Sequence, residues 1–257
     1  MDAEKEMQEY SERHMSRGRI MVGRVFTYVF RVLVFGIIAI VLWRVLLSDR
    51  IPKDAKTLLV NEATYAAYVA EGESLTMYTQ AQDEIAVNET EDGVYGLFWV
   101  SQTAFIPEAD QIQILTRYNN STLRHIATDF KLQEIPSREE TVADVSLVVT
   151  TDPTPLDRDN GDEVKTRYLA SGAPAVDATK MYNYRKYIFD GVAFDPATTV
   201  DITVEFYYAE RVNYDKLPYC SLRIFDNEFE IDPLALTSRD ERALKAYGET
   251  RRDEVSR

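Results

Sequence analysis

The sequence predicts a mainly β protein: an antiparallel β-sandwich, of immunoglobulin-like or jelly-roll type, with one N-terminal transmembrane helix and short peripheral helices. First, one stretch, 25–47, is apolar enough to cross a bilayer. Second, roughly eight to ten later segments alternate apolar and polar residues, as half-buried strands do. Third, no helical pattern separates these segments, so the strands must be largely antiparallel and each apolar face needs a covering layer.

The apolar stretch Val25–Leu47 carries two arginines, Arg31 and Arg44, near its ends. A spanning helix needs about 20 mostly apolar residues. The uninterrupted run Val32–Trp43 is shorter, which also suits a buried or interfacial helix. Arginine can carry its charge to the membrane interface, and the run has no polar face, so we expect a span through the lipid bilayer. Alternatively, Arg31 pairs with an acid on a partner helix.

The basic residues around this stretch predict its orientation. One more basic residue precedes the stretch than follows it, which keeps the N-terminus in the cytoplasm. The predicted order is a cytoplasmic segment 1–24, a transmembrane helix 25–47, a juxtamembrane link 48–56 and an extracytoplasmic domain 57–232 at a plasma membrane. The flanking residues are Arg13, Arg17, Arg19 and Arg24 on one side and Arg50, Lys53 and Lys56 on the other.

The chain beyond residue 56 is strongly acidic. Of the 43 acidic and 29 basic residues in the chain, 7 acidic and 10 basic ones lie in residues 1–56. The remaining 36 acidic and 19 basic residues give residues 57–257 a net charge of −17, which argues against nucleic acid as a partner. The single cysteine, Cys220, cannot form an intrachain disulfide, and its alternation with Leu222 predicts a buried residue.

The elements beyond the apolar stretch follow in order. Thr57–Val60 suits a first strand, and Asn61 caps a predicted helix over Glu62–Ala70, which Gly72 ends. Two smaller sandwiches, divided near Pro153–Glu163, are the alternative to one. Further strands, separated by turns rich in Asp, Asn, Gly and Pro, are predicted at Ser74–Gln80, Val94–Ile106, Gln111–Tyr118, Leu123–Leu132, Val145–Val149, Val164–Ala170, Lys180–Phe189, Val200–Ala209 and Cys220–Glu230.

Residues 233–257 are predicted to form a short helix and a disordered tail. Ser238–Glu241 matches the capping box that starts a helix. Arg242–Tyr247 continues it, and Gly248 is expected to end it. The polar and charged residues Glu249–Arg257 have the composition of a disordered terminus.

Tyrosine and arginine provide the candidate binding residues. Tyr182, Tyr184 and Tyr187 lie beside Arg185 in the sequence. Both residue types are enriched at recognition surfaces, so these four are the predicted ligand-binding surface. Tyrosines that simply cover a sheet face are the alternative.

The densest acidic run, residues 151–163, contains Asp157, Asp159 and Asp162. Clustered carboxylates in a loop are candidate calcium ligands. Their spacing lacks the glycine and glutamate of an EF-hand, so a solvated loop is the alternative. No other metal site and no cofactor is predicted.

Catalytic constellations are not apparent. His125 is the one histidine beyond the apolar stretch, and Asp129 could orient it. The strand predicted at Leu123–Leu132 would hold the two far apart. A pair of carboxylates for glycoside hydrolysis could converge without any sequence signature.

The sequence therefore predicts a single-pass, membrane-anchored extracytoplasmic binding or assembly module that is not an enzyme. Its expected partners are the lipid bilayer, through residues 25–47, and another membrane or envelope protein. The alternatives are a tethered hydrolase of cell-envelope glycan that uses paired carboxylates, and an accessory subunit of a membrane complex held through its span.

Overall fold

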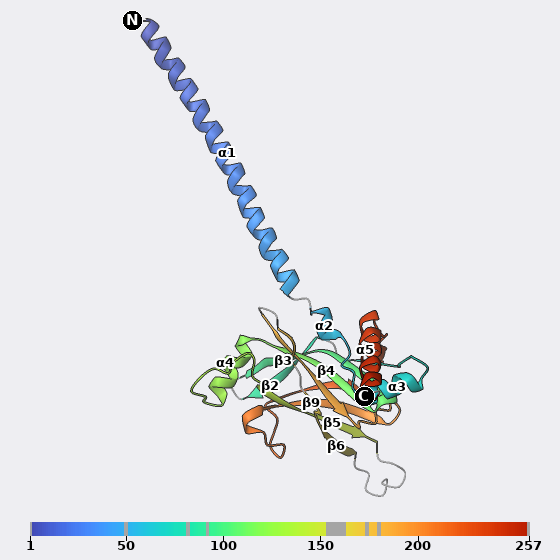
Figure 1. The fold of residues 1–257 in the computed structure, drawn as a ribbon. Helices are drawn as coiled ribbons and strands as arrows, with labels where there is room; N and C mark the ends of the chain where they lie inside the picture. The colour runs from blue at the N-terminus through green and yellow to red at the C-terminus, as the bar shows by residue number, and fades with distance from the viewer. Residues whose placement is uncertain are drawn as a thin grey trace. The chain divides into compact units, whose positions relative to one another are not determined.

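A computed structural model describes residues 2–48, 51–80, 83–90, 93–152, 163–172, 175–178 and 181–255. The chain divides into two compact units, Met1–Arg50 and Ile51–Arg257. The first holds the long helix α1 (Asp2–Ser48), and the second holds the strands and the remaining helices (Figure 1).

Helix α1 contains an apolar stretch of 20 residues, Arg24–Trp43, with a mean hydropathy of 2.5. The side chains along this stretch are exposed, that of Arg31 included. Its length and composition are those of a membrane span, and an N-terminal signal sequence has the same signature. Arg44 follows one position later in the same helix, and its side chain lies outside the described part of the structure.

The second unit is built on one antiparallel sheet in the order β6-β5-β9-β10-β2-β3-β4-β8-β7. This confirms the mainly antiparallel β class. The short strand β1 pairs with β3 and with β11. The strands are β1 (Tyr78–Thr79), β2 (Glu84–Thr90), β3 (Gly93–Ile106), β4 (Gln111–Tyr118), β5 (Ala143–Thr151), β6 (Val164–Leu169), β7 (Ala175–Ala178), β8 (Asn183–Asp190), β9 (Thr199–Tyr208), β10 (Cys220–Asp226) and β11 (Asp232–Pro233).

The sheet curls into a half-barrel whose concave face encloses the main apolar core (Figure 1). Phe98 of β3 stacks on Phe206 of β9 with ring centroids 4.8 Å apart. The Tyr187 hydroxyl of β8 donates to the Ala143 carbonyl of β5 at 3.0 Å. Because neither pair of strands is adjacent in the sheet, the curved face packs against itself. The two-sheet sandwich is not confirmed: curvature of one sheet, rather than a second sheet, covers the apolar side chains.

The strand predicted at Leu123–Leu132 is wrong, because these residues fall largely in helix α4 (Asn120–Asp129). The Asn119 side chain accepts hydrogen bonds from two backbone N–H groups of the first turn, and the Thr122 hydroxyl oxygen accepts one from the Asn119 N–H. Leu123 and Ile126 are spaced three apart and point into the core. The residues therefore form a capped amphipathic helix.

The beginning of the second unit covers the outer, convex face of the sheet. Helix α2 (Lys53–Lys56) comes first, and α3 (Glu62–Ala70) follows, capped by Asn61 as predicted. Residues 57–60 are not a strand. Leu59 instead donates its N–H to the Gln113 side chain at 3.0 Å and accepts from it at 2.7 Å. A side chain thus supplies the pairing that a neighbouring strand would have supplied.

The C-terminal helix α5 (Ser238–Val255) runs through Gly248, so the predicted helix end and the predicted disorder of 249–255 are wrong. Leu244 is fully buried beside Tyr68 of α3, and Arg251 pairs with Glu62. A Cβ at position 248 would lie 2.3 Å from the Tyr65 hydroxyl. Glycine here permits close packing of the two helices rather than ending one.

Gly248→Ala should lower the free energy of unfolding by about 1–3 kcal/mol, the usual cost of overpacking. Without the contact, replacing glycine by alanine inside a helix would stabilise the chain by about 1 kcal/mol. A loss of stability would therefore indicate overpacking, and a gain would indicate helix propensity. Chemical denaturation of the full chain in detergent, followed by near-UV circular dichroism, provides the measurement. In a Tyr65→Ala background the same substitution should stabilise. An equal loss in both backgrounds would contradict the contact.

Candidate functional site

Strand β8 divides the predicted binding surface between its two faces. Tyr187 and Arg185 point inward, and Arg185 donates to the backbone carbonyls of Glu139 and Glu140 at 2.9 Å each. Tyr184 lies on the opposite face, and burial raises the pKa of both Tyr184 and Tyr187. These three side chains are buried and Tyr182 is half-buried, so the four do not form one exposed surface.

On the outer face, Tyr182 belongs to a cluster around Arg117. The Arg117 guanidinium lies 4.6 Å from the Tyr182 ring centroid and 5.8 Å from that of Trp99. Asp83 pairs with it at 3.5 Å. Cation–π contacts and an ion pair therefore compensate a buried charge.

The candidate calcium ligands Asp157, Asp159 and Asp162 lie outside the described residues, as does most of the proposed division near Pro153–Glu163. Within the part of the chain that the structure describes, no group of three or more His, Cys, Asp or Glu side chains could hold a metal ion.

His125 and Asp129 lie one turn apart on exposed positions of α4, closer than the predicted strand allowed. The Tyr219 hydroxyl donates to Asp129. Cys220 is buried, as expected, and burial raises the pKa of its thiol, which keeps it in the unreactive protonated form.

Two carboxylates, Asp144 and Glu205, occupy diagonal positions on β5 and β9. Each accepts a hydrogen bond of 2.7 Å from a tyrosine, Asp144 from Tyr214 and Glu205 from Tyr207. Burial, together with its bond to Asp144, raises the pKa of Tyr214 to about 12. Arg167 also pairs with Glu205 at 3.1 Å. Each carboxylate is therefore held by its own partners, Asp144 by Tyr214 and Glu205 by Tyr207 and Arg167.

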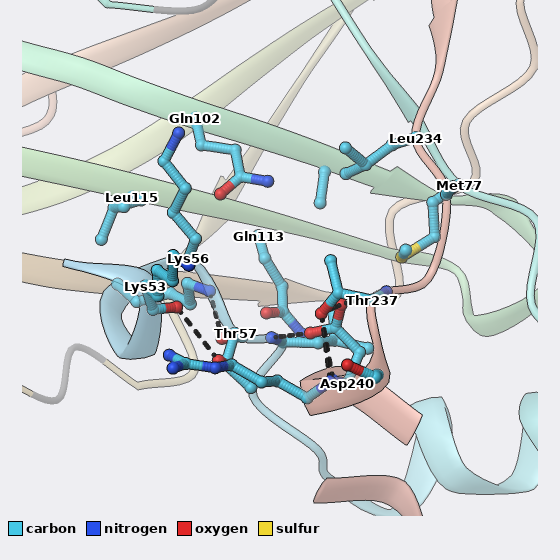
Figure 2. Close-up of a pocket in the computed structure, with 16 residues that line it drawn as sticks. Lys53, Lys56, Thr57, Met77, Gln102, Gln113, Leu115, Leu234, Thr237 and Asp240 are labelled. Atoms are coloured by element: carbon cyan, nitrogen blue, oxygen red, sulfur yellow. Dashed lines mark hydrogen bonds between the residues drawn. The ribbon is translucent and has the colours of Figure 1, made fainter. Parts of the chain in front are cut away.

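The outer face of the sheet also contains a pocket of about 480 Å³ (Figure 2). Its floor comes from β3, β4 and β8, and its walls come from α2, residues 57–58 and the segment that leads into α5. The lining residues are Lys53, Lys56, Thr57, Leu58, Met77, Gln102, Ala104, Gln113, Leu115, Lys186, Leu234, Ala235, Thr237, Ser238, Arg239 and Asp240.

Hydrogen bonds hold the two walls of the pocket together. The Asp240 carboxylate accepts from the Leu58 N–H at 2.6 Å and from the Thr237 N–H and hydroxyl at 2.8 and 2.6 Å. Arg239 pairs with Asp54 of α2. The wall that precedes α5 is thereby fastened to the wall that begins the unit, as the dashed lines at Asp240 show (Figure 2).

Lys186 contributes a buried ammonium group to this pocket. Lys186 is 4% exposed, and its Nζ atom donates a hydrogen bond to the Thr57 carbonyl at 2.6 Å. The ion pairs among the described residues do not include it. Burial lowers its pKa from 10.5 to about 8, against an opposing effect of the Asp240 charge. Asp240 thus acts on this ammonium without forming an ion pair, and the described residues give the ammonium one hydrogen-bond acceptor, the Thr57 carbonyl.

Gln102 adds a second incompletely satisfied group to the pocket. Its Oε1 atom is buried and has no hydrogen-bond partner among the described residues. Register places Gln102 of β3 opposite Leu115 of β4, which in turn pairs with Lys186 of β8. An amide and an ammonium thus lie on one line across the pocket floor, and both favour a polar group there.

Comparison of the chain with known protein families, with curated proteins and with solved structures found no match. The function is therefore inferred from the geometry of the pocket.

Sequence reasoning missed Gln102, Gln113 and Lys186 as site residues. The alternation in β4 correctly put Gln113 on the polar face, but this face is buried under α2, α3 and α5. Lys186 adjoined the predicted tyrosine surface without being included in it. No local signal joins these residues, because strand register alone brings them together.

Lys186→Met should remove a rise in stability at alkaline pH. Between pH 8 and 10.5 the folded chain has released a proton that the unfolded chain still binds, so stability increases with pH. The shift corresponds to roughly 3–4 kcal/mol at about 1.4 kcal/mol per pKa unit. Urea unfolding of the full chain at several pH values measures it, with the exposed Lys216→Met as control. An unchanged slope in Lys186→Met would contradict the assignment.

Proposed function

We propose that the chain is a single-pass membrane protein whose extracytoplasmic β-domain is a non-enzymatic binding module, and that the pocket over β3, β4 and β8 is its binding site. The observation that carries this proposal is the pocket of about 480 Å³ with a buried ammonium on its floor. Its volume lies within the range of about 300–1,000 Å³ typical of small-molecule sites.

The apolar stretch of α1 supports the membrane anchor. Proteins in water rarely expose so long an apolar surface, and the stretch has the length of a span. The basic excess before it supports a cytoplasmic N-terminus. The lipid bilayer is therefore a partner through residues 25–47, and the β-domain lies outside the cytoplasm.

The carboxylates support binding rather than hydrolysis. Glycoside hydrolysis needs two carboxyl groups about 5–9.5 Å apart across the scissile bond. Asp240 is the one carboxylate among the residues that line the pocket, and both of its oxygens accept hydrogen bonds from the protein. Among the described residues, no second acid lines the pocket to act with it.

A photo-crosslinking amino acid in the pocket should capture the natural ligand. With a diazirine side chain at position 234, irradiation of native membranes should add the mass of another molecule to the full chain. The same side chain at the exposed position 135 is the control. Ala104→Phe, which fills the pocket floor, should abolish the adduct at 234. Equal adducts at both positions, or no effect of Ala104→Phe, would contradict a site in this pocket.

Protease treatment should show the orientation of the chain. In intact cells stripped of any outer wall, added protease should digest residues 51–257 and leave an epitope tag at the N-terminus intact. Immunoblots with tags at the two ends provide the measurement. Lysed cells, in which both tags should be lost, are the control. Survival of the C-terminal tag in intact cells would place the β-domain inside.

A further inference from the structure

The buried cation of the pocket has no ion-pair partner among the described residues, because Asp240 lines the same pocket but does not pair with it. Lys186 is 4% exposed. Its ammonium group has three N–H donors, and the Thr57 carbonyl is the acceptor that the described residues provide for them. Burying an ammonium without an anion is costly. A bound anion would supply the missing charge and the missing hydrogen-bond acceptors.

Cations are concentrated at this pocket although the domain as a whole is acidic. Lys53, Lys56 and Arg239 join Lys186 in its lining, against Asp240 alone. Asp240 is engaged by backbone and hydroxyl donors, and Arg239 by Asp54. Lys53 and Lys56 are exposed on α2, at the end of the pocket opposite Thr237 and Asp240 (Figure 2). The local charge therefore favours an anionic group at the α2 end.

The pocket surface also has an apolar part, beside neutral polar groups such as Gln102 and Gln113. Its carbon-lined part comes from β3, β4 and the two walls, and it consists of Leu58, Met77, Ala104, Leu115, Leu234 and Ala235. None of the lining residues is aromatic, so the stacking platform that commonly holds a nucleobase is missing. Aliphatic walls beside a cationic floor suit a hydrocarbon chain with a charged head.

We propose that the pocket binds a single-chain amphiphile with an anionic oxygen head group, and that Lys186 binds the head while the aliphatic wall holds the chain. This inference rests on the proposed binding function and names its ligand class. The head is a carboxylate, as in a fatty acid, or a phosphate monoester, as in lysophosphatidic acid. Lys53 and Lys56 attract either head electrostatically. The unpartnered Gln102 Oε1 atom is an acceptor, so it suits a hydroxyl group of the ligand rather than its anionic oxygens.

Isothermal titration of the full chain in phosphatidylcholine nanodiscs tests the proposal with four probes of equal chain length. These probes are decanoate, decyl phosphate, decanol and decyltrimethylammonium, and protein-free nanodiscs give the blank. Decanoate or decyl phosphate should bind at least about tenfold more tightly than decanol, since a charge-assisted bond to the ammonium is worth that much. Decyltrimethylammonium should not bind. The tighter of the two anions identifies the source of the head group.

Two lysine variants assign the effect to the pocket. Lys186→Met should bring the affinity for the anionic probe down to that of decanol, and should leave the decanol affinity unchanged, which shows that the pocket is still folded. Lys216→Met, in an exposed loop, should keep the preference. Anions that bind no better than decanol, or a preference that survives in Lys186→Met, would overturn the proposal. Binding of all uncharged and anionic probes alike, with the crosslink at 234 intact, would leave the binding function standing without this ligand class.

Discussion

Strand β4 is buried on both of its faces, and the arrangement of the second unit follows from this constraint. Its inward side chains, such as Ile112 and Ile114, form part of the apolar core. Its outward side chains include Gln111, Gln113 and Arg117, which need polar partners once they are covered. Those partners come from elsewhere: Gln113 bonds to residue 59, Gln111 to Thr64 and Asp190, and Arg117 to aromatic rings and an acid. Leu115, the outward residue between Gln113 and Arg117, is buried with Ala55 of α2 and also lines the pocket.

Most of the long strands could be predicted from the sequence, but their arrangement could not. Period-two alternation is a local property, and it located most of β3, β4, β5, β8, β9 and β10. Curvature depends on where strands slip past one another. Register shifts occur in the pairings β2–β3, β3–β4 and β9–β10, and such bulges increase the twist and bend of a sheet. Because no residue pattern marked these positions, flat alternating strands favoured a sandwich, whereas the bent sheet closes on itself.

Two helices show how local signals and tertiary contacts compete. At α4 the helical signal was present in the sequence: Asn119 and Thr122 form a capping box, and Leu123 and Ile126 have helical spacing. Because asparagine is also common in turns, residues 119–122 were predicted to be a turn between two strands. At α5 the local signal was misleading, because a glycine near a helix end is typical of a stop. Only the packing of Tyr65 against position 248 accounts for glycine inside the helix, and such a contact between residues far apart in sequence has no local signature.

The pocket depends on such distant contacts even more strongly. Lys186 reaches its floor through the pairing of β8 with β4, and its walls come from the two ends of the unit. The Asp240 carboxylate and the Leu58 N–H join these ends across 182 positions of sequence. A molecule in the pocket would contact the floor and both walls together, so its binding would stabilise the docking of both ends, in the manner of any ligand that binds the folded state alone. Since α2 begins only a few residues after α1 ends, the wall that such a ligand touches is also the part of the domain that directly follows the apolar helix.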